Sequence, residues 1–91
     1  MAADQLHEMA LPDEIVLRLR RLTPREKEIL DLLACGWSTS AIASRLYISQ
    51  ATVRNHVQHI LAKLGVHGRL EAILTLLRGR EGAGAPRSPS K

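Results

Sequence analysis

Three polar side chains, Arg54, Asn55 and Gln58, lie close together in the sequence. A guanidinium can donate two parallel hydrogen bonds to guanine, and the amides of asparagine and glutamine pair with adenine. No aspartate or glutamate occurs between Asp31 and Glu71, so the charged side chains of this stretch are all basic. These residue types and the one-sided charge indicate contacts with the bases of a nucleic acid.

Hydroxyls and further basic side chains flank these three residues and suit phosphate oxygens. Side-chain hydroxyls, cations and the free N–H groups of helix N-termini all bind phosphate. The candidates for phosphate contacts are Ser38, Thr39, Arg45, Ser49, Thr52 and Lys63. Together with the base-reading candidates, they predict an interface for double-stranded DNA.

A short helix, a tight turn and a longer helix must position these side chains. Ser38 can cap a helix of about eight residues, and Ser49 can cap a helix over 50–64 that Gly65 closes. The longer helix has one apolar stripe at helical spacing, formed by Val53, Val57, Ile60, Leu61 and Leu64. Its opposite face presents Gln50, Arg54, Asn55, Gln58 and Lys63. This arrangement is a helix-turn-helix, whose second helix fits the major groove.

Two more helices complete the predicted bundle. Thr23-Pro24-Arg25-Glu26 is a capping box with proline at the first helical position, and Gly36 ends that helix. On the last helix, 69–78, one apolar set can pack inward: Ala72, Ile73 and Leu76. A second set, Leu70, Leu74 and Leu77, is either a dimer or partner surface, or core beneath the N-terminal segment.

The fold class that follows is all-α, a four-helix bundle with a flexible C-terminal tail. The chain has 91 residues, 45% of them hydrophobic, and no phenylalanine, so one small domain with an aliphatic core is expected. Residues 23–78 form this domain. Residues 1–22 are an N-terminal extension or linker that can hold a short amphipathic helix, and residues 79–91 are a disordered tail that lacks large apolar side chains.

Composition argues against several other classes of protein. A single cysteine forbids an internal disulfide, the apolar runs are too short to cross a membrane, and acidic residues near the start argue against a signal peptide, so a cytoplasmic location is expected. Cys35 is expected to be an inert thiol. His56 and His59 lack a second pair of ligands, and no catalytic triad is apparent, so we expect no metal, no cofactor and no enzymatic activity.

The run from Leu22 to Gly79 resembles the DNA-binding domain of the LuxR family of bacterial transcription regulators, including its NarL and FixJ types. The resemblance is carried by Leu22-Thr23-Pro24-Arg25-Glu26, Ile42-Ala43, Arg45-Leu46, Ile48-Ser49, Thr52-Val53, His56-Val57, Ile60-Leu61, Lys63-Leu64-Gly65-Val66, Arg69 and Glu71-Ala72. It implies the four-helix effector fold, with base readout at Arg54, Asn55 and Gln58 and phosphate contacts around Thr52. It also implies dimerisation through the last helix.

Two departures from the family pattern affect the interface. Thr39-Ser40-Ala41 stand where the family often has Asn-Lys-Glu, which leaves the short helix less well capped. Gln58 stands where a basic residue is common, which reduces the electrostatic share of binding.

The function predicted from the sequence is a sequence-specific regulator of transcription that binds double-stranded DNA as a homodimer, with helix 50–64 in the major groove. The chain is then either a stand-alone effector domain or a fragment of a larger regulator, and RNA polymerase is a further candidate partner. The alternative is a protein-interaction module, for instance an anti-activator that pairs with a full-length regulator through helix 69–78.

Overall fold

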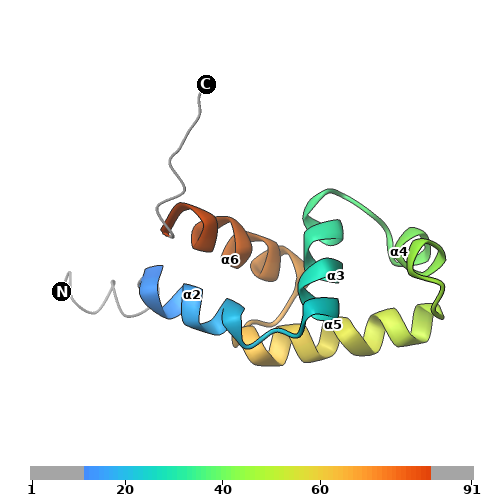
Figure 1. The fold of residues 1–91 in the computed structure, drawn as a ribbon, viewed down its shortest axis with the longest axis horizontal. Helices are drawn as coiled ribbons and strands as arrows, with labels where there is room; N and C mark the ends of the chain where they lie inside the picture. Colours follow the sequence, from blue (N-terminus) through green and yellow to red (C-terminus); the bar gives the residue numbers. More distant parts are fainter. Residues whose placement is uncertain (1–11, 83–91) are drawn as a thin grey trace, which may run out of the picture.

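The computed structural model describes residues 12–82, and these residues form helices joined by turns, without a strand (Figure 1). This confirms the all-α prediction. The helices are α2 (Pro12–Arg20), α3 (Pro24–Ala34), α4 (Thr39–Leu46), α5 (Gln50–Leu64) and α6 (Arg69–Gly82). None of the described helices is long and apolar enough to span a membrane. The predicted extension at 1–11 and the predicted tail at 83–91 lie outside the described residues.

Aliphatic side chains from every described helix form one core, as the composition predicts. The largest fully buried side chains are Ile29, Leu30, Ile42, Val53, Ile60 and Leu64. Helix α5 contributes three of these and packs against both α3 and α4. The stripe predicted along 50–64 is therefore the surface that fixes α5 to the rest of the domain.

Helix α2 is the short amphipathic helix that the sequence allows in the extension. Ile15 and Leu19 are buried on it, and Leu22 is buried directly after it. Acidic Asp13 and Glu14 in its first turn and Arg18 and Arg20 in its last turn suit the helix dipole. Helix α2 packs along α6 (Figure 1), so this segment belongs to the folded body.

Both ends of helix α3 agree with the sequence signals. The Thr23 hydroxyl accepts a hydrogen bond from the Glu26 backbone N–H at 3.1 Å, and the Glu26 carboxylate accepts one from the Thr23 N–H at 2.9 Å. This is the predicted capping box. At the other end, Gly36 has a φ of 91°, a conformation that glycine adopts without strain.

Helix α6 is longer than predicted, and the predicted start of the disordered tail at residue 79 is wrong. The helix continues to Gly82, and Gly79 is buried against Ile15 and Leu19 of α2. A glycine after a helical pattern usually marks a helix end. Here its missing side chain instead lets two helices approach, because a Cβ at this position would collide with Leu19.

A large side chain at Gly79 is expected to destabilise the fold. For Gly79→Leu we expect a loss of about 1–2 kcal/mol in the free energy of unfolding, because overpacking outweighs the gain in helix propensity. Urea denaturation followed by circular dichroism measures the loss. Arg78→Leu adds the same side chain one residue earlier on the exposed surface and is expected to be nearly neutral. Equal stability of the two variants would contradict the close approach of α2 and α6.

Candidate nucleic-acid interface

Helix α5 presents the three base-reading candidates on its solvent side. Arg54, Asn55 and Gln58 are exposed, whereas the stripe from Val53 to Leu64 is buried. Helix α4 supports α5 from one side through buried Ile42 and Ala43. A helix held along one face by two neighbours can present its other face to a groove.

The connection between α4 and α5 is fixed by backbone hydrogen bonds and by Tyr47. The Ile48 N–H donates to the Ala43 carbonyl at 3.0 Å. Tyr47 caps α4 with a φ of 58° in the left-handed region, which is uncommon for a residue with a side chain, and the residue is 95% exposed. The sequence predicts a tight turn here but gives no sign that Tyr47 would take this conformation.

The hydroxyls predicted to meet phosphate also cap the two helices. Ser38 accepts from the Ala41 N–H at 3.1 Å, and Ser49 accepts from the Thr52 N–H at 3.0 Å. The hydroxyls of Ser49 and Thr52 lie 2.9 Å apart. Ala41 has no carboxylate to complete a capping box, so only half of that motif is present at α4, as expected. Both helix N-termini begin with an exposed serine beside free backbone donors.

Arg45 and Trp37 form a contact at the edge of the core. The Arg45 guanidinium lies 5.3 Å from the centre of the Trp37 ring, within the range of a cation–π interaction. Trp37 packs against the core, and Arg45 remains exposed. The indole therefore restricts where the charge of Arg45 lies without removing it from solvent.

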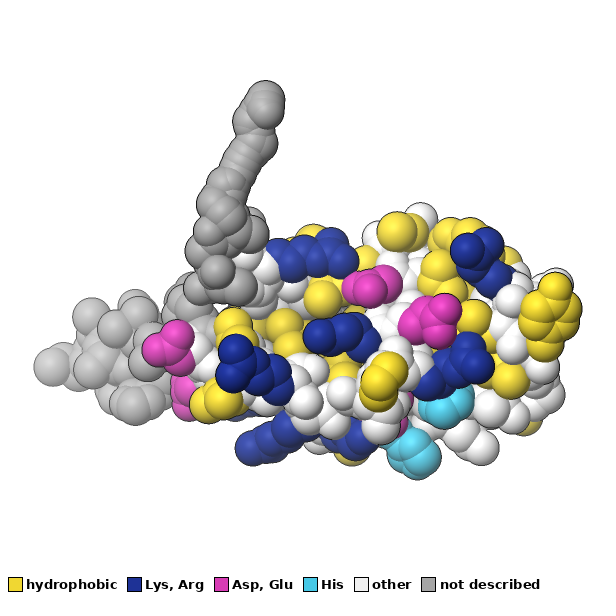
Figure 2. Space-filling model, in the orientation of Figure 1, with side chains coloured by type: hydrophobic (Ala, Val, Ile, Leu, Met, Phe, Trp, Pro, Cys, Tyr) yellow, Lys and Arg dark blue, Asp and Glu magenta, His cyan; other side chains and the backbone are white. Residues whose placement is uncertain are grey.

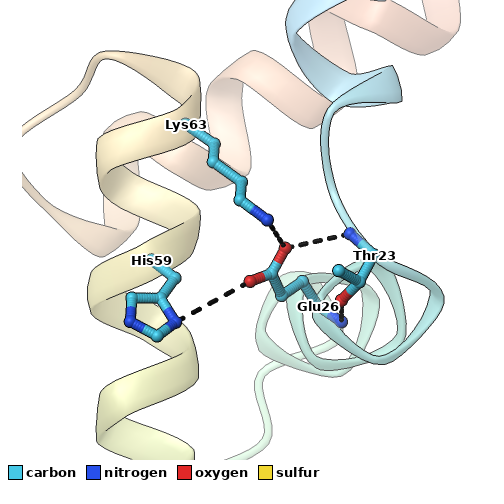
Figure 3. Close-up of polar contacts among 4 residues, drawn as sticks. All are labelled: Thr23, Glu26, His59 and Lys63. Carbon is cyan, nitrogen blue, oxygen red and sulfur yellow. Dashed lines mark hydrogen bonds and ion pairs between the residues drawn. The ribbon is translucent and has the colours of Figure 1, made fainter.

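The helical pattern places Lys63 on the solvent face of α5, but in the structure its side chain is bound to Glu26 of α3. Its ammonium donates to the Glu26 carboxylate at 2.7 Å, and its side chain is 34% exposed (Figure 3). His59 Nδ1 lies 3.9 Å from the other carboxylate oxygen. Glu26 thus joins the N-terminus of α3 to the last turns of α5, a contact that helical periodicity within α5 does not reveal.

The pKa of Glu26 reflects this position. Burial alone would raise the pKa of the carboxyl group, since the charged form loses solvation. The hydrogen bonds from Lys63 and Thr23 and the positive charge of Lys63 outweigh burial, and the pKa of Glu26 lies below its ordinary value of 4.5. The carboxylate is therefore ionised at neutral pH.

Arg69 is a candidate for the interface that the sequence pattern alone did not single out. Its guanidinium donates to the Thr39 hydroxyl at 2.6 Å, which joins the N-termini of α4 and α6. It also lines a recess of about 190 Å³ beside α5, together with Arg54 and Gln58. Arg69 belongs to the acid-free stretch, which is the signal that the sequence offers for it.

The second leucine set of α6 faces solvent. Leu70, Leu74 and Leu77 are 68%, 43% and 42% exposed, while Ala72 and Leu76 are buried as predicted. These leucines therefore do not form core beneath α2, the described helix of the N-terminal segment, because α2 packs against the Gly79 side of α6. An exposed row of leucines is typical of a surface that meets another protein.

Cys35 and the possible metal ligands are the remaining residues that the sequence analysis considered. The thiol of Cys35 is free and exposed. Within residues 12–82, no group of three histidine, cysteine, aspartate or glutamate side chains is arranged to hold a metal ion.

Comparison with known proteins agrees with this geometry. A sequence model of the luxR family of bacterial regulatory proteins matches residues 20–76. The spore germination protein GerE of Bacillus subtilis is 51% identical over 57 residues, which cover 63% of this chain and 77% of GerE. The nitrate/nitrite response regulator protein NarL of Escherichia coli K12 is 46% identical over 54 residues, 59% of this chain and 25% of NarL.

A longer match extends to the transcriptional regulatory protein DesR of Bacillus subtilis, which is 41% identical over 73 residues. That match covers 80% of this chain and 37% of DesR, so the chain spans most of GerE but well under half of NarL and DesR. The family match covers more than half of the chain and contains both helices of the motif. The chain belongs to the luxR family of bacterial regulatory proteins and carries its helix-turn-helix DNA-binding domain.

Proposed function

We propose that this chain regulates transcription by binding a specific sequence of double-stranded DNA, with α5 in the major groove. The observation that carries the proposal is the exposed, acid-free face of α5. Arg54, Asn55 and Gln58 project from it, and each has a donor or acceptor pattern that matches base edges. We assign them to base readout.

The proposed phosphate contacts come from the elements around α5. They are Ser38, Thr39, Arg45, Ser49 and Thr52, to which we add Arg69 because its guanidinium lies at Thr39. Lys63 contributes less to this set, since its ammonium is bound to Glu26. Contacts of this kind fix the orientation of the domain on DNA without reading its sequence.

Salt dependence tests the proposal directly. Only cations release counterions from DNA, and the proposed phosphate contacts include two arginines, Arg45 and Arg69, with a smaller contribution from Lys63. Two to three neutralised phosphates per copy predict that affinity for mixed-sequence duplex DNA falls roughly 10- to 40-fold between about 50 and 200 mM salt. Fluorescence anisotropy of a labelled duplex measures this fall. A folded chain that does not bind at about 50 mM salt would contradict the proposed function.

We propose further that two copies pair through α6. Leu70, Leu74 and Leu77 supply an exposed apolar row, and pairing would place two α5 helices on half-sites about one DNA turn apart. RNA polymerase is proposed as a later partner of the DNA-bound form, and the cytoplasm as the compartment. The chain acts in this way either as a stand-alone effector domain or as part of a longer regulator.

Charged substitutions on the leucine row test the dimer. Leu74→Asp with Leu77→Asp is expected to weaken binding to a two-half-site duplex at least about tenfold, and to leave single half-site binding unchanged, because linked sites gain from avidity. Anisotropy on the two duplexes and sedimentation of the free chain measure both effects. Leu17→Asp, at an exposed leucine of α2, is the matched control. Equal losses on both duplexes would contradict pairing through α6.

The same exposed leucines favour a second candidate function. A protein-interaction module would use α6 to pair with a full-length regulator and would leave α5 unoccupied. Substitutions on α5 separate the two functions, because they would abolish the activity of a DNA-binding regulator and spare that of an interaction module.

A further inference from the structure

A groove lies between α2, α3 and α6, with a volume of about 330 Å³. None of its lining residues comes from α4 or α5. The groove is therefore separate from the face assigned to DNA, and neither the proposed base contacts nor the leucine row uses it.

The floor of the groove is apolar. Leu19 and Leu76 are buried beneath it, and the half-buried side chain of Val16 forms one side. Gly79 also lines the groove, and Leu19 occupies the space that a Cβ at this position would need. Binding pockets for organic groups begin at about 300 Å³, so the floor has room for a large apolar side chain.

The rim of the groove is basic. Arg20 and Lys27 are exposed and make no ion pair within the part of the chain that the structure describes. Arg80 and Asp31 complete the lining and bind each other at 3.1 Å, so their charges offset one another. Figure 2 shows hydrophobic side chains between basic ones on the face over α2 and α6. The apolar floor is complementary to an apolar group, and the two unpaired cations at the rim are complementary to negative charge next to that group.

We propose that this groove docks a segment of a partner protein in which a bulky apolar side chain is flanked by aspartate or glutamate. The apolar side chain would cover Leu19 and Leu76, and the carboxylates would meet Arg20 and Lys27. DNA is a poorer occupant, because its phosphate backbone offers nothing to cover the apolar floor. The groove is also open to solvent, which suits a side chain presented by a protein segment. This docking site does not depend on the proposed DNA contacts.

An unbiased selection tests the proposal. The full chain is used to select binders from a displayed library of random peptides about twelve residues long. We expect the enriched peptides to combine aspartate or glutamate with leucine, phenylalanine or tryptophan, and to bind the chain in solution. Enrichment without acidic residues, or no enrichment by the folded chain, would overturn the proposal.

Variants locate the binding of the selected peptides. Arg20→Glu with Lys27→Glu is expected to weaken it at least about tenfold. Arg21→Glu with Arg78→Glu makes the same change of charge on exposed residues outside the groove and is expected to have little effect. Val16→Lys separates the apolar contribution to binding from the electrostatic one, because it adds positive charge to the groove but makes its apolar surface polar. This variant is also expected to weaken binding of the selected peptides. Equal losses in the two charge-reversed variants, or unchanged binding by Val16→Lys, would show that the groove is not the site.

Discussion

Alanine at Arg54, Asn55 and Gln58 together is expected to abolish sequence-specific binding of DNA. Each well-formed contact to a base edge is worth about 1–3 kcal/mol of discrimination. The loss of all three should therefore lower affinity for a selected operator by at least about 100-fold and bring it close to the affinity for unrelated DNA. The three residues are exposed on α5, so the substitutions leave the core intact.

The measurement compares specific and non-specific DNA. An operator is first selected from random sequence with the unmodified chain, and binding is then measured by anisotropy on operator and scrambled duplexes. Arg78→Ala removes one positive charge from α6 and is the control for charge alone. If the triple variant kept its preference for the operator, α5 would not be the helix that reads the bases.

Loss of the Glu26 carboxylate is expected to cause the largest fall in stability. Glu26→Ala removes the acceptor for the Thr23 N–H and for the Lys63 ammonium, and both groups lie partly buried. Lys63 is 34% exposed and can regain water, so the expected cost is about 2–3 kcal/mol rather than that of a fully buried charge. For a domain of this size, such a loss lowers the melting temperature by roughly 10–20 °C.

Glu28 provides the matched control on the same helix. Its carboxylate pairs with Arg25 at 3.3 Å, and both side chains are about half exposed. Exposed pairs contribute about 0–1 kcal/mol, so Glu28→Ala should change the melting temperature little. A similar fall for both variants would mean that the contacts of Glu26 contribute no more than a surface ion pair.

The pH dependence follows from the direction of the Glu26 shift. Because the pKa is lower in the folded chain than its ordinary value of 4.5, ionised Glu26 stabilises the fold above that value. The contribution is lost as the pH falls below 4.5 and through the folded pKa. Glu26→Gln lacks this titration, so the stability difference between the unmodified chain and this variant should shrink with acid. Denaturation curves from neutral pH to about pH 3 would test this.

Local signals in the sequence were enough to define helices α3, α4 and α5 and the class of function. The hydroxyls of Thr23, Ser38 and Ser49 cap α3, α4 and α5 where expected, because a cap acts on a backbone group only three residues away. The apolar stripe of α5 and the acid-free stretch are also readable along the chain. Arg54, Asn55 and Gln58 then had to face solvent, since the buried stripe takes the opposite side of the helix.

Contacts between distant residues were decided only by the tertiary structure. Lys63 and Glu26 are 37 residues apart, and Arg69 and Thr39 are 30 apart, so no periodicity links them. The role of Gly79 depends likewise on α2, which turns an apparent helix end into a helix contact. The sequence indicates the local conformation that each residue favours, over one or two turns of helix. The contacts between helix faces depend on how all the helices pack around one core. This packing places Lys63 against Glu26 and not on the solvent face of α5, and it forms the groove that Gly79 lines.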